Sequence, residues 1–186
     1  TVNTTGFTGT IALATFTLTN TGTITHDGGT ITSGTGGIDG GAMTMSSGVP
    51  TAVVTVTGAG TWRLNSLTIQ AGGTFTAAAA TIMMDGNWDN TGGTFTYGTS
   101  IVVWAANGSF INGGGYTDFY SVTVNAATIL TLSSVGNILV NNTLTVNGTI
   151  TGATGTAQLA VSSTSPVAPL VLGASGSVSG LSAVNF

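Results

Sequence analysis

The chain has 186 residues, of which 41% are hydrophobic and only 3% are charged, and its formal net charge is −4 at pH 7. With Arg63 as its only Arg and no Lys, it lacks the many cationic contacts that binding to a nucleic-acid backbone requires. The absence of Cys excludes disulfides and thiolate metal sites, and no apolar run approaches the roughly 18 residues of a membrane-spanning helix.

The composition favours short β-strands separated by turns. About a fifth of the residues are Thr, which is β-branched and suits a pleated surface, and the 30 Gly residues suit turns with positive φ. Strong helix formers such as Glu and Lys are missing. We therefore expect an all-β fold.

The first strands are expected between Thr1 and Thr32, where apolar residues alternate with Thr. Within this region, the stretch from Thr8 to Asn20 contains no charge and no Pro and has high β-propensity. These properties predict that it is an assembly element that exchanges or adds strands between copies. Its apolar residues are Ile11, Leu13, Phe16 and Leu18.

The next stretch, Ser33 to Pro50, is crowded with Gly and is predicted to be a long loop or a coil broken by an excursion. It suggests a division of the chain into two parts. Residues 1–60 would form an N-terminal β segment with a Gly-rich loop, which could serve assembly. Residues 61–186 would form a regular β-solenoid.

The strongest signal is a repeat. The pentapeptide Gly-Gly-Thr-Phe-Thr occurs at Gly72–Thr76 and again at Gly92–Thr96, a return after 20 residues, and each copy leads into an apolar run. A fixed return of this size is typical of stacked-repeat architectures. We therefore expect a parallel β-solenoid with coils of about 20 residues, in which Leu67 and Ile69 face inward. Short strands separated by Asn and Gly turns continue to the C-terminus, with Val122 and Val124 also facing inward.

The stretch Thr81 to Trp104 resembles repeats of secreted bacterial right-handed parallel β-helix proteins of the adhesin- or haemagglutinin-like group. The matching residues are Gly86-Asn87-Trp88, Asn90, Gly92–Thr96, Gly98-Thr99-Ser100 and Val102-Val103. The resemblance covers Leu64 to about Gly152, roughly half of the chain. It implies the fold and an extracellular or cell-surface location, and it brings no catalytic residues.

The run Asp85-Gly86-Asn87-Trp88-Asp89-Asn90 is the best candidate for a metal site, because Asp85, Asn87 and Asp89 offer oxygen ligands for Ca²⁺ at alternate positions. The run lacks a bidentate Glu and the 12-residue frame of a calcium loop. The favoured interpretation is a turn whose Asp and Asn side chains bond their own backbone. We therefore expect no bound metal.

Catalytic interpretations are disfavoured. His26 and Asp27 are adjacent, so on a strand they point to opposite faces and cannot easily form a relay. Glycosidase or lyase chemistry would require carboxylates such as Asp85, Asp89 and Asp118 to converge. It would usually also require cationic side chains, and Arg63 is the only one in the chain. The expected role of Arg63 is instead to anchor an Asp within the subunit or in a neighbouring one.

Two surface hypotheses remain. The aromatic residues could form a sugar-stacking platform, although core or interface packing is favoured; they are Trp62, Trp88, Trp104, Tyr97, Tyr116 and Tyr120. Thr-x-Thr pairs such as Thr74/Thr76 and Thr94/Thr96 could bind ice through ordered water on a flat face. Their irregular spacing between coils argues against that role.

The sequence thus predicts a non-enzymatic structural subunit without a cofactor. Its low net charge gives little repulsion between copies, so we expect a homo-oligomer or polymer that forms an extracellular filament, fibre or sheath. Assembly would proceed by β-strand addition or by end-to-end stacking of coils. The alternatives are a segment of a cell-surface adhesin stalk and an ice-binding solenoid.

Overall fold

The structure, a computed structural model, describes residues 1–45, 52–113, 115–152, 157–161, 170–179 and 183–185. These residues form a parallel β-solenoid of about 7 turns, with about 21 residues per turn. The described part of the chain contains strands and turns but no helix. The expectation of an all-β solenoid with short coils is confirmed.

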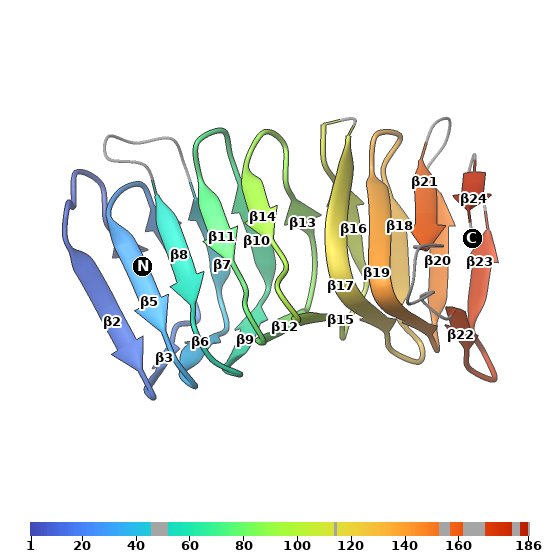
Figure 1. Ribbon diagram of the computed structural model, residues 1–186, viewed down its shortest axis with the longest axis horizontal. Helices are drawn as coiled ribbons and strands as arrows, with labels where there is room; N and C mark the ends of the chain where they lie inside the picture. The colour runs from blue at the N-terminus through green and yellow to red at the C-terminus, as the bar shows by residue number, and fades with distance from the viewer. Residues whose placement is uncertain (46–51, 114, 153–156, 162–169, 180–182, 186) are drawn as a thin grey trace.

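Three sheets run along the solenoid (Figure 1). Sheet A contains β1 (Val2–Asn3), β4 (Thr23–His26), β7 (Ala42–Met45), β10 (Ser66–Ile69), β13 (Trp88–Asp89), β16 (Gly108–Ile111), β18 (Ile129–Leu132), β20 (Thr149–Gly152) and β23 (Ser177–Ser179). Sheet B contains β2 (Thr10–Ala14), β5 (Thr30–Ser33), β8 (Val53–Val56), β11 (Thr74–Thr76) and β14 (Thr94–Thr96). Sheet C contains β3 (Thr17–Thr19), β6 (Gly37–Asp39), β9 (Thr61–Leu64), β12 (Thr81–Met84), β15 (Ile101–Trp104), β17 (Tyr116–Val124), β19 (Asn137–Val146), β21 (Gln158–Val161), β22 (Leu170–Leu172) and β24 (Ala183–Asn185).

The repeated pentapeptide occupies equivalent positions in neighbouring turns. Strands β11 and β14 pair in parallel, with Thr74–Thr76 beside Thr94–Thr96 and Phe75 beside Phe95, so the 20-residue return is one turn of the solenoid. Gly72 and Gly92, which open the two copies, have φ values of +83° and +88°. Glycine adopts this backbone conformation without the steric cost that other residues incur.

The core consists of apolar columns that the parallel register builds inside the three sheets. In sheet C, for example, Ile82, Val102 and Val122 lie above one another and are fully buried. Leu67, Ile69 and Val124 are also fully buried, so the inward orientation predicted for them and for Val122 is confirmed. Each turn covers the apolar residues of the next, which is why a single coil could not be stable alone.

Of the two interpretations of Ser33–Pro50, the long loop is wrong for the residues that the structure describes, because Gly37–Asp39 and Ala42–Met45 are strands. A Cβ atom on Gly37 would lie 2.0 Å from the carbonyl oxygen of Thr61 in the next turn. Glycine at this position therefore allows close stacking of strands. Residues 46–50 of the predicted loop lie outside the described residues. The same sheets continue across residue 60, where β8 pairs with β11 and β7 with β10.

Candidate functional site

A break in sheet B creates a cleft on the solenoid surface. β14 is the last strand of sheet B, and among the described residues it pairs only with β11. The following turn instead contains the long strand β17, which runs through the level of sheet B into sheet C with a register irregularity between Phe119 and Ser121. The cleft between β14 and β17 has a volume of about 410 Å³.

The floor of this cleft is polar. Asn90, which follows β13, donates a hydrogen bond from Nδ2 to Oγ1 of Thr117 in β17, with a distance of 3.1 Å between the two atoms. Both side chains are buried, with 9% exposure for Asn90 and 4% for Thr117. The Asn90 Oδ1 atom has no hydrogen-bond partner among the described residues. One side of this buried amide therefore lacks the partner that such groups usually have.

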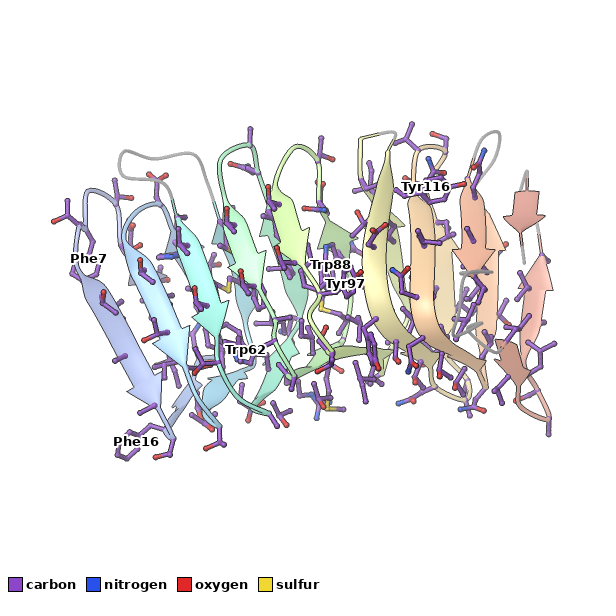
Figure 2. The ribbon with its side chains drawn as sticks, in the orientation of Figure 1. Phe7, Phe16, Trp62, Trp88, Tyr97 and Tyr116 are labelled. Atoms are coloured by element: carbon purple, nitrogen blue, oxygen red, sulfur yellow. The ribbon has the colours of Figure 1, made fainter. Side chains whose placement is uncertain are left out.

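The rim of the cleft carries aromatic rings and one carboxylate. Tyr97 follows β14, and Tyr116 begins β17 with 45% of its surface exposed (Figure 2). The Tyr116 hydroxyl donates a hydrogen bond to Oε1 of Gln158. Asp118 lies two residues further along β17, and partial burial raises the pKa of its carboxyl above the usual value.

The oxygen atoms proposed as calcium ligands have other partners. Asp85 accepts two hydrogen bonds from Arg63, at 2.6 Å from Nε and 3.2 Å from Nη2. Asn87 Oδ1 accepts from the backbone N–H of Ser109 in the next turn. Asp89 Oδ1 accepts from the N–H of Thr91, the local turn that the sequence favoured. No group of three or more His, Cys, Asp or Glu side chains among the described residues could hold a metal ion.

His26 lies in the interior of sheet A at the corner with sheet B and is fully buried. Its Nε2–H donates to the Val53 carbonyl at 3.0 Å, and its Nδ1 accepts from the Thr4 hydroxyl at 2.9 Å. This tautomer follows from the two partners, since a carbonyl can only accept. Burial lowers the pKa of His26 below 6.5, and the bond to Val53 opposes this shift. The side chain joins three successive turns.

The carboxylates proposed for hydrolytic chemistry lie in different parts of the solenoid. Asp85 follows β12, Asp89 is in β13 of sheet A, and Asp118 is in the first half of β17. No strand register that involves Asp89 or Asp118 places a second carboxylate beside either of them. Arg63 anchors Asp85 within the subunit, as the sequence suggested.

The tryptophans do not form an exposed sugar-stacking platform. Trp62, Trp88 and Trp104 are completely buried, so the prediction of core packing is confirmed for them. The Trp88 ring lies edge-on to Phe95 and Phe119, with ring centroids 4.9 and 5.3 Å apart. Tyr97 and Tyr116 are the aromatic residues of the proposed platform that line the cleft.

The predicted assembly residues lie at one end of the solenoid, where β2 and β3 are end strands. Leu13 is buried, Ile11 and Leu18 are half-buried, and Phe16 is 75% exposed. Figure 2 shows Phe16 and Phe7 at this end of the molecule. The four residues therefore belong to the same end turn, and Phe16 is accessible to a partner.

The Thr-x-Thr pairs are more regular in space than in sequence. In sheet B the outward positions form two rows, one of which contains Thr32, Thr55, Thr76 and Thr96 in consecutive strands. The neighbouring row contains Thr30, Val53, Thr74 and Thr94. The coils that contain these rows differ in length only in the turns between strands. The irregular spacing of the Thr pairs in the sequence therefore leaves the strand register of sheet B unchanged. The sequence argument against an ordered Thr face is wrong for this sheet.

Sequence reasoning did not single out Asn90 or Thr117 as a pair. The sequence does contain a signal for this region. The Gly-Gly-Thr-Phe-Thr motif occurs in two successive turns but is absent from the next turn, which contains Thr117. The loss of the motif marks the point where a separate strand of sheet B gives way to β17.

Comparison with known proteins adds no identification: the chain matches no protein-family model, no curated protein and no solved structure. The resemblance to adhesin-like repeats therefore stays a prediction. The described part of the chain contains no apolar helix of membrane-crossing length.

Proposed function

We propose that this protein is a structural subunit of an extracellular filament, fibre or sheath whose copies stack end to end. The observation that carries the proposal is the chemistry of the end strands. At one end β1, β2 and β3 contain no charged residue and no Pro, and at the other end the same holds for β22, β23 and β24. Charged residues and Pro are the usual features that prevent pairing of exposed strand edges.

The direction of the strands suits a head-to-tail interface. Because the strand pairs along the solenoid are parallel, the free edge of β23 could continue into β1 of another copy with unchanged polarity. An interface between two different surfaces of the same protein propagates into open filaments when its rotation does not close a ring. Apolar groups are exposed at both ends, Phe16 at one and Val171 and Leu172 at the other.

The test compares two single-charge variants of the same sheet face. Ala12 and Thr32 are register partners in β2 and β5, so Ala12→Lys places a cation on the end strand and Thr32→Lys places it one turn inside. We expect unmodified protein and Thr32→Lys to form regular filaments in electron micrographs, while Ala12→Lys stays monomeric. A monodisperse unmodified protein would reject the filament proposal and favour a stalk segment whose ends continue into other coils.

Ordering of water at ice is a second candidate function, favoured by the two Thr rows of sheet B. No outward-facing residue of β5, β8, β11 or β14 is charged, and the strands of a sheet lie about 4.8 Å apart. The result is a regular array of hydroxyl and methyl groups on one face. Such an array could hold water in an ordered layer.

A thermal-hysteresis assay tests this second candidate. Thr76→Lys would disrupt the centre of the Thr rows, whereas Thr145→Lys makes the same change at a half-buried position of β19 in sheet C. If sheet B binds ice, Thr76→Lys should abolish most of the hysteresis and Thr145→Lys should preserve it. Absence of hysteresis in the unmodified protein would reject ice binding.

A further inference from the structure

The cleft between β14 and β17 lies where the described strands of two neighbouring turns are not joined by parallel pairing at the level of sheet B. The two strands approach each other with Cα atoms within 8 Å. An additional strand between them would need about 9.6 Å, because neighbouring strands lie about 4.8 Å apart. The cleft is therefore too narrow for a β-strand, and an occupant would be bound by side chains.

These side chains combine aromatic surface with groups that bind hydroxyls. Phe95 occupies the same column as Phe75, but Phe75 is fully buried whereas Phe95 remains partly exposed in the cleft. Tyr97 adds a further ring, and Asp118 supplies a carboxylate that accepts hydrogen bonds. The Tyr116 ring instead extends away from β14, because its hydroxyl is bonded to Gln158. Aromatic faces beside a few polar groups are typical of sites that bind small ligands, and a volume of about 410 Å³ lies in the usual range.

A second observation points to a polar occupant. Asn90, which lines the cleft, has a buried side-chain oxygen, Oδ1, without a hydrogen-bond partner among the described residues. Buried polar groups without partners are rare and usually mark a place where water or a ligand belongs. A ligand rich in hydroxyl groups suits this polar floor better than an apolar one.

The charged groups of the protein limit the class of ligand further. Among the described residues, Asp118 is the only charged group that lines the cleft, and Arg63, the chain's only Arg or Lys, is paired with Asp85. An acidic sugar would therefore meet a carboxylate and no cation. We propose that the cleft binds a neutral oligosaccharide, with Tyr97 contacting a sugar ring and Asp118 accepting hydrogen bonds from sugar hydroxyls. This binding does not depend on the stacking of subunits.

Isothermal titration calorimetry tests the proposal with four neutral trisaccharides: cellotriose, maltotriose, mannotriose and N,N′,N″-triacetylchitotriose. Trigalacturonate serves as the acidic comparison. We expect at least one neutral trisaccharide to bind with a millimolar or lower Kd and trigalacturonate not to bind. Tyr97→Ala and Asp118→Ala should each weaken that binding about tenfold, as expected for loss of a ring contact or of a bond to a charged group. Tyr120→Ala and Asp39→Ala, which change a Tyr and an Asp outside the cleft, should stay within about twofold of the unmodified protein.

Three outcomes would overturn the proposal: no binding of any neutral trisaccharide at millimolar concentration, equal binding of trigalacturonate, or equal losses in cleft and control variants. If a cleft variant fails to fold, NMR titration of Ala12→Lys, the variant expected to stay monomeric with an intact cleft, decides. Amide signals of residues 94–97 and 116–118 should shift on addition of the bound trisaccharide, and shifts confined to other turns would reject the cleft. Measuring binding on Ala12→Lys as well separates a failure of the cleft from a failure of filament assembly.

Discussion

At the scale of single residues, polar side chains inside the solenoid connect successive turns. His26 bridges the Thr4 hydroxyl and the Val53 carbonyl, and Asn112 donates from Nδ2 to the Asn137 carbonyl at 2.8 Å. Such bonds are strong only while every partner is present, because an unpaired buried polar group is costly. Protonation of one member should therefore affect several turns.

His26 predicts a loss of stability in mild acid. Its folded-state pKa is lowered, so as pH falls the unfolded chain binds the proton first, and the stability from neutral His26 declines from pH 6.5 down to the folded pKa. The slope should not exceed about 1.4 kcal/mol per pH unit. Denaturant unfolding at a series of pH values measures it. His26→Gln removes the chain's only His, and an unchanged slope in that variant would assign the effect elsewhere.

At the scale of the strand and its turn, glycines decide how closely neighbouring turns stack. Gly93 enters β14, and a Cβ atom there would lie 2.3 Å from Cγ2 and 2.5 Å from the carbonyl oxygen of Ile69. Gly115 precedes β17 and would meet nothing within 4 Å. The two glycines therefore offer a matched comparison on opposite sides of the cleft.

Gly93→Ala should destabilise the protein by about 1–3 kcal/mol, because either the strand or Ile69 must move. Gly115→Ala should change the free energy of unfolding by less than about 0.5 kcal/mol. Thermal or urea unfolding of both variants measures the difference. Equal stabilities would show that β14 can shift away from Ile69 at little cost.

The sequence was informative where local pattern and stacking agree. Alternating residues such as Val122 and Val124 predicted their buried face, and the pentapeptide at Gly72 predicted the length of a turn. The interpretation failed around Gly37, since a glycine needed for close contact with Thr61 looks the same in sequence as a glycine in a loop. The cleft could not be predicted either, because it depends on β17 continuing as one strand from the level of sheet B into sheet C, where β14 had been followed by a turn.

At the scale of the whole molecule, stability and assembly should share one physical basis. Each turn buries the apolar columns of its neighbours, and a second copy placed on an end would extend those columns by the same contacts. Only the Arg63–Asp85 pair is seen as a salt bridge in the part of the chain that the structure describes. Hydrophobic burial and backbone pairing would therefore dominate the proposed filament contact, with little contribution from ion pairs.

This basis predicts how the proposed filaments respond to salt. Raising NaCl from about 0.1 to 1 M shortens the screening length from about 10 to 3 Å, which weakens contacts between exposed charges. Filaments held by apolar columns should survive this change, and sodium sulfate should lower the critical concentration for assembly, since it strengthens apolar burial. Sedimentation of filaments across both salt series provides the measurement, with Thr32→Lys as a charge-altered control. Dissolution by NaCl would mean that charges hold the copies together, and the end-stacking interface would then be wrong.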